Sequence, residues 1–151
     1  DLLAYIQPVF IDLDMNTVEP AVGARRMDKI YAWKSMLDMG IHASGGSDAP
    51  VVSFDAMENI YFAVTRKNIK GQPEEGWIPS EKMSVDEAVK LFTKNAAYAS
   101  YTEKENGTIE TGKNADLVVL EKDIYSIDPD EIKTVKVDMT VLGGKVVFER
   151  E

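Results

Sequence analysis

Two short apolar runs separated by a helical pattern constrain the fold of this chain more than any other feature. The first run covers residues 2–6 and the second covers residues 41–44. Between them, apolar residues recur at helical spacing over residues 24–39, and Gly40 stands where a helix C-terminus is expected. Residues 9–22 are mixed in character and predict a loop. A strand, a crossover helix and a second strand form the βαβ unit of a parallel sheet.

The second run leads into Gly45-Gly46-Ser47-Asp48-Ala49-Pro50-Val51, which places a carboxylate just beyond the carboxyl end of a predicted strand. The two glycines widen the range of backbone conformations, and Pro50 disfavours the helical conformation at Ala49. Barrels and open sheets of the α/β class carry their catalytic residues at this edge. Asp48 is therefore a candidate catalytic residue, with a turn-forming or helix-capping role as the alternative.

The middle of the chain predicts two further helices. Residues 55–67 carry apolar side chains on one face, and residues 68–82 contain two glycines and two prolines, which indicate a long loop. Ser84 and Glu87 have the spacing of a capping box, and the apolar stripe behind them predicts a helix to Ala99.

Beyond residue 103 the pattern changes from helical to β. Residues 107–109 predict a short strand, and residues 116–120 form a strongly apolar one. Residues 135–141 alternate between apolar and polar side chains, as in a half-buried strand. Gly143-Gly144 then predicts the two-residue turn of a hairpin.

The charge balance and the rare residue types exclude several functions. With 26 acidic and 17 basic residues the net charge is −9, which disfavours nucleic acid and anionic membranes as partners. Because the 151 residues include no Cys and one His, His42, the chain alone cannot build a thiolate site, a His-based triad or a multi-His metal site. The chain starts without a signal-peptide pattern, and we expect a cytoplasmic location.

Four motifs in order resemble the metal-dependent amidohydrolases. The similarity is greatest to the YtcJ-like branch (amidohydrolase family 3), which includes N-substituted formamide deformylases. The matching motifs are Gln7-Pro8-x-Phe10, Gly45-x-Ser47-Asp48-Ala49-Pro50-Val51, Gly107-x-Ile109-x-x-Gly112-Lys113-x-Ala115-Asp116-Leu117-Val118-Val119-Leu120 and Val141-x-Gly143-Gly144-Lys145-Val146-Val147.

This resemblance implies an α/β fold in which the chain is the C-terminal fragment of a TIM (β/α)8 barrel. Residues 1–103 would supply its last two strands and helices. Residues 104–151 would supply part of a small antiparallel β-sandwich. The chain would then begin around the seventh barrel strand.

The resemblance also implies a hydrolase that cleaves C–N bonds of the amide, imide or N-formyl type in a small-molecule substrate. Asp48 matches the family's aspartate that contacts a divalent metal, with zinc as the first expectation, and acts as general base on the metal-activated water. The family's His ligands on earlier strands have no counterpart here, so we expect the isolated chain to be inactive. The alternative is a non-catalytic interaction or regulatory module with the same fold.

Other polar residues have a functional and a structural interpretation. Gln7 could line the same mouth as Asp48 or cap its strand. His42 is expected to be a buried, hydrogen-bonded imidazole rather than a ligand. Arg26 and Arg66 are expected to be solvated helix residues rather than substrate contacts. The free strand edges of such a fragment also predict self-association.

Overall fold

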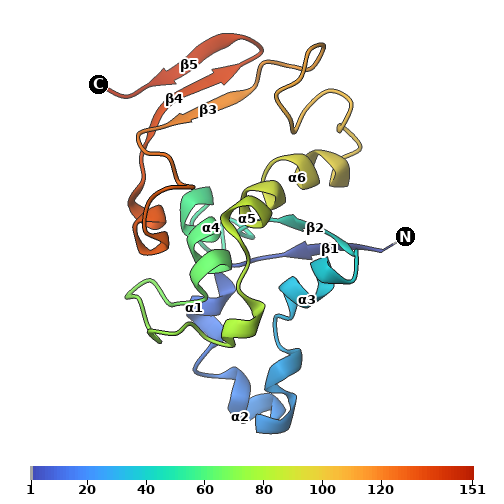
Figure 1. The fold of residues 1–151 in the computed structure, drawn as a ribbon, viewed down its shortest axis with the longest axis vertical. Helices are drawn as coiled ribbons and strands as arrows, with labels where there is room; N and C mark the ends of the chain where they lie inside the picture. The colour runs from blue at the N-terminus through green and yellow to red at the C-terminus, as the bar shows by residue number, and fades with distance from the viewer. Residues whose placement is uncertain (1) are drawn as a thin grey trace.

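The computed structural model describes residues 2–151 and has an α/β fold, as predicted, with one parallel and one antiparallel sheet (Figure 1). No helix within this range is long and apolar enough to cross a bilayer. In chain order the elements are β1 (Leu3–Ile6), α1 (Phe10–Asp14), α2 (Val18–Val22), η1 (Ala24–Lys29), α3 (Trp33–Asp38), β2 (His42–Gly45), α4 (Ala56–Thr65), η2 (Pro79–Glu81), α5 (Val85–Leu91), α6 (Lys94–Ala99), β3 (Leu117–Leu120), η3 (Pro129–Thr134), β4 (Val137–Leu142) and β5 (Lys145–Glu149).

The predicted βαβ unit is present. Strands β1 and β2 pair in parallel with Leu3 opposite His42 and Ile6 opposite Gly45. Residues 24–39 do not form the single helix predicted there, because they contain the 3-10 helix η1 and the short helix α3. Tyr31 has a φ of 47° between them, a conformation that an α-helix does not contain. Gly40 follows α3 with a φ of 79°, as its predicted position requires.

The loop predicted over residues 9–22 is wrong in part, because α1 and α2 lie there. Ile11 is fully buried, and its burial holds the single turn of α1 against the core. A five-residue helix is too short to produce the apolar periodicity by which sequence patterns are recognised.

Helix α4 is the centre of the hydrophobic core. Asp55 caps its N-terminus by accepting hydrogen bonds from the backbone N–H groups of Met57 and Glu58. Eight of the ten residues of α4 are buried, and Ile132 of η3 is buried in the same core. The segment η3, near the C-terminus, thus packs with α4, which follows β2. The domain boundary expected near residue 103 stays a prediction.

The capping box predicted at Ser84 and Glu87 is confirmed, with both of its reciprocal hydrogen bonds formed. The helix predicted to run to Ala99 is interrupted, however, at Thr93, where φ is −127° and ψ is −97°. Two helices, α5 and α6, therefore replace one, and the ring of Phe92 beside the interruption packs against Gly45 in β2.

The second sheet contains β3, β4 and β5 in antiparallel order, as the alternating pattern predicts. Gly143 and Gly144, both with positive φ, form the predicted hairpin turn. Residues 107–109 form no strand, which corrects that prediction. Figure 1 shows this sheet standing apart from the helices around β1 and β2, and Val118, Val146 and Phe148 are about half exposed on it. A β-sandwich would need a second layer, so that part of the predicted fold stays a prediction.

Candidate functional site at the carboxyl edge of the parallel strands

The candidate site lies where β1 and β2 both end. The backbone N–H of Gly46 donates to the carbonyl of Ile6 at 2.9 Å, so the strand pairing extends one step beyond β2. Gln7 directly follows β1, and Asp48 lies three residues beyond the end of β2. The structure therefore brings the segments of both residues to one edge of the sheet, the edge at which α/β enzymes place their chemistry.

Asp48 adopts a left-handed backbone conformation, which the two glycines before it do not adopt. Its φ is 60°, whereas Gly45 and Gly46 have no positive φ. The carbonyl of Asp48 accepts a hydrogen bond from the N–H of Val51 at 2.9 Å, which closes a turn around the cis peptide between Ala49 and Pro50. The carboxylate projects from this closed turn, and the residue is exposed.

Position 45 requires glycine because the ring of Phe92 packs directly against its backbone. A Cβ atom added at Gly45 would lie 2.6 Å from Cζ of Phe92, a distance that real contacts do not reach. No heavy atom lies within 4 Å of the corresponding position at Gly46. The first glycine therefore lets the aromatic ring pack on the end of β2, directly before the turn that carries Asp48.

Asn59 of α4 joins the segment that follows β1 to the N-terminus of α4. Its Oδ1 accepts from the N–H of Val9 at 3.1 Å, and its Nδ2 donates to the carbonyl of Asp55 at 2.9 Å. The side chain is 1% exposed, so both bonds form away from water. Sequence reasoning missed this residue, although a polar residue in the buried stripe of a helix is the signal that could have revealed it.

His42 is exposed on β2, which corrects the prediction of a buried imidazole. Its ring lies 4.6 Å from the ring of Tyr98, measured between centroids. Among residues 2–151, β2 has β1 as its one strand neighbour, so the position lacks the cover that a central strand would have. The structure gives His42 no part in the candidate site.

Arg66 is fully buried, so the prediction of a solvated helix arginine is wrong for it. Its Nε donates to the carbonyl of Trp77 at 2.7 Å, and its Nη1 donates to the carbonyl of Tyr31 at 3.1 Å. Burial lowers the pKa of Arg66 to about 10, an effect that the nearby charge of Glu81 opposes. Arg26 is exposed, as predicted, and its Nη1 donates to the carbonyl of Val22.

The described residues do not form a complete metal site. Within residues 2–151, no group of three or more His, Cys, Asp or Glu side chains is close enough to hold a metal ion. The exposed carboxylate of Asp48 is a suitable oxygen donor for a divalent cation, but a single donor makes a weak site. Any remaining ligands would have to come from outside the described residues.

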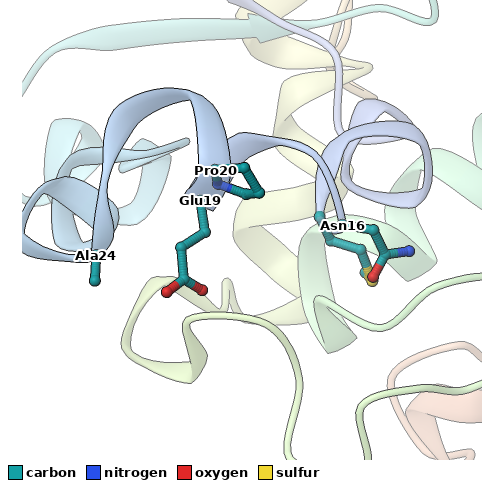
Figure 2. A pocket seen from close by; sticks show the side chains of 5 residues that line it. Asn16, Glu19, Pro20 and Ala24 are labelled. Atoms are coloured by element: carbon teal, nitrogen blue, oxygen red, sulfur yellow. The ribbon is translucent and has the colours of Figure 1, made fainter.

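A pocket lies elsewhere, beside α2. It has a volume of about 480 Å³ and is lined by residues of α2, of η1 and of the link between α1 and α2, among them Asn16, Glu19 and Ala24. Figure 2 shows the Glu19 side chain between Ala24 and Asn16 in this view, with no strand-end residue among the sticks. Asp48 thus does not line this pocket.

Comparisons with known proteins identify the family. The sequence model of the amidohydrolase family matches residues 2–148. The chain belongs to the amidohydrolase family. It is 37% identical over 145 residues to the Bacillus subtilis protein YtcJ, named as an amidohydrolase, covering 96% of this chain and 27% of YtcJ. It is 36% identical over 122 residues to an N-substituted formamide deformylase from Arthrobacter pascens, covering 81% of this chain and 22% of that enzyme.

The fold is also similar to parts of solved structures. A metal-dependent hydrolase from Pyrococcus horikoshii superposes with a TM-score of 0.72 at 22% identity, covering 83% of this chain and 25% of that chain. A Xaa-Pro dipeptidase superposes with a TM-score of 0.62 at 18% identity, covering 97% of this chain and 34% of that one. The chain therefore spans about a quarter of the length of the curated amidohydrolase relatives, and the YtcJ-like resemblance is confirmed.

Proposed function

We propose that this chain is part of a metal-dependent hydrolase that cleaves C–N bonds of the amide, imide or N-formyl type in small molecules. The observation that carries the proposal is the position of Asp48, an exposed carboxylate on a closed turn at the carboxyl edge of two parallel strands. The similarity to a formamide deformylase supports the bond type.

In the proposed reaction, Asp48 has two tasks. Its carboxylate would contribute one ligand to a divalent cation, for which zinc is our first candidate, and would accept the proton of the attacking water. A bound divalent cation lowers the pKa of its water towards about 7, which supplies a nucleophile at neutral pH. The hydrogen bond between Val51 and Asp48 fixes the backbone from which the carboxylate projects.

The remaining ligands would come from a longer polypeptide. We propose that β1 and β2 are the last two strands of a (β/α)8 barrel, because the family relatives are about four times as long as this chain. Strands β3 to β5 would then form part of a β-sandwich, with a boundary near residue 103. Taken alone, the 151 residues would be inactive and would self-associate through their free strand edges.

The test is turnover by the full-length gene product. Asp48→Asn should abolish amide hydrolysis while leaving the folded state intact by circular dichroism. Asp28→Asn, at another exposed acidic residue, should leave turnover unchanged. Turnover that survives in Asp48→Asn would refute the general-base role. A wild-type protein that neither binds a divalent metal nor hydrolyses amides would instead favour the non-catalytic interaction or regulatory module.

A further inference from the structure

Asn95 forms a long-range hydrogen bond to the strand that leads to Asp48. It is the second residue of α6, and its Nδ2 donates to the carbonyl of Ala43 in β2 at 2.9 Å. Helix α6 packs against β2 (Figure 1), and Ala43 is 1% exposed, so the bond is partly shielded from water. Loss of the donor would leave this carbonyl poorly hydrated, which carries a cost in free energy. The side chain thus holds a backbone position that lies five residues before Asp48.

Two further contacts hold the end of β2. The ring of Phe92, at the C-terminus of α5, packs against Gly45. The N–H of Gly46 donates to the last carbonyl of β1 at 2.9 Å. Together with the bond from Asn95, these contacts hold the backbone over the last residues before the turn that carries Asp48. The position of that turn therefore depends on the junction of α5 and α6 as well as on β1.

We propose, on the basis of the proposed function, that Asn95 is a positioning residue for Asp48. Its amide holds the backbone of β2, and β2 sets where the Asp48 carboxylate lies relative to the other ligands of the divalent cation. A displacement of about 1 Å in such a site can cost about a hundredfold in rate. Residues that orient a metal ligand typically contribute about 10–100-fold to metal affinity or activity. Asn95 would therefore affect metal binding without contacting the metal or the substrate.

The zinc affinity of the full-length gene product tests this role. Asn95→Leu keeps a side chain of similar size but removes the donor, and it should weaken Zn²⁺ binding about tenfold in a chelator competition assay. Asn95→Gln keeps an amide donor and should recover part of the affinity. Asn114→Leu is the matched control, because Nδ2 of Asn114 donates to Oδ1 of Asn106, also at 2.9 Å, in the segment between α6 and β3. This control should leave the zinc affinity unchanged.

Hydrogen exchange gives a second measurement that needs neither metal nor turnover. In mass spectrometry of the metal-free full-length protein, the backbone amides of residues 43–51 should exchange faster in Asn95→Leu than in the wild type. Asn114→Leu should leave the exchange of this segment unchanged. Arg66→Met removes the hydrogen bonds of a buried side chain elsewhere in the fold, and it should lower stability without weakening Zn²⁺ binding. This variant separates the positioning of Asp48 from a general loss of stability.

Three results would overturn the inference. The first is a wild-type zinc affinity in Asn95→Leu when Asp48→Asn weakens binding. The second is unchanged hydrogen exchange over residues 43–51 in Asn95→Leu. The third is a loss of zinc affinity in Arg66→Met as large as in Asn95→Leu. The proposed function fails by a different result, namely turnover that survives in Asp48→Asn.

Discussion

Arg66 and Trp77 are joined by two reciprocal hydrogen bonds. The N–H of Trp77 donates to the carbonyl of Arg66 at 2.7 Å, and Nε of Arg66 donates to the carbonyl of Trp77 at 2.7 Å. The guanidinium carbon also lies 5.5 Å from the ring centroids of Trp33 and Trp77. Because Nη1 reaches the carbonyl of Tyr31, one side chain ties the segment after α4 to the link before α3.

Arg66→Met should therefore destabilise the fold by about 2–4 kcal/mol, since two charge-assisted hydrogen bonds are lost and two partly buried carbonyls lose their donor. The left-handed backbone at this position, with a φ of 53°, affects Arg and Met alike and should not add to the difference. Urea denaturation followed by tryptophan fluorescence measures the change. Arg25→Met, at an exposed position, is the control, and an equal effect at both sites would contradict the assignment.

A second long-range contact caps a helix that has no cap of its own. Ala32, the N-cap residue of α3, makes no side-chain capping bond. The carboxylate of Glu81 instead accepts from the N–H of Ser35 at 3.0 Å and from the Ser35 hydroxyl. Glu81 is 5% exposed, so these bonds are shielded from water.

Glu81→Gln should lower the free energy of unfolding by about 1–2 kcal/mol, because the charge-assisted capping bond is weakened. The matched control is Glu74→Gln, an exposed position in the same loop, which should have almost no effect. A double-mutant cycle with Ser35→Ala should give a coupling energy of about 1 kcal/mol. Simple additivity of the two substitutions would show that the contact contributes nothing.

The fold was predictable wherever the pattern is local and long enough. The capping box at Ser84, the hairpin at Gly143 and the pairing of β1 with β2 all follow from spacing within short segments. Two of the failures are the interruptions at Tyr31 and Thr93, where helical periodicity continues across a non-helical backbone. Such interruptions depend on tertiary packing, which cannot be read from the local sequence.

The candidate site was predictable to a similar degree. The motif around Asp48 predicted that this residue follows the carboxyl end of a strand, and strand direction places it there. Its catalytic role stays a prediction. Outside the candidate site, the burial of Arg66 and Glu81 could not be predicted, since their partners lie between 11 and 46 residues away and a charged side chain at a helix end is normally solvated. His42 was predicted to be buried, but within residues 2–151 β2 pairs with β1 alone, and the imidazole is exposed.

The contribution of the hydrogen bond between Tyr31 and Asp14 to the free energy of unfolding should decrease at alkaline pH. Burial, with the hydrogen bond to Asp14 as second cause, raises the pKa of Tyr31 to about 12 from an ordinary value of 10. The folded protein holds this proton more tightly than the unfolded chain, so the stabilisation is present below pH 10 and disappears between pH 10 and about 12.

Tyr31→Phe should therefore be less stable than wild type at neutral pH by about 1 kcal/mol, and the difference should narrow as the pH rises above 10. Urea denaturation at pH 7 and at several values between pH 9 and 11.5 measures both effects. Tyr125→Phe, at an exposed position, should show neither the loss at neutral pH nor the narrowing. A difference for Tyr31→Phe that is independent of pH would contradict the raised pKa.

The two adjacent glycines before Asp48 allow the sharpest test of packing at the candidate site. Gly45→Ala should destabilise the protein by about 1–3 kcal/mol, because the new methyl group would overlap the ring of Phe92. Gly46→Ala should be nearly neutral, since that position faces open space and has no positive φ. Combining Gly45→Ala with Phe92→Leu should recover part of the loss, as chemical denaturation of the three variants would show. Equal effects at Gly45 and Gly46 would mean that both glycines act through backbone flexibility rather than through the contact with Phe92.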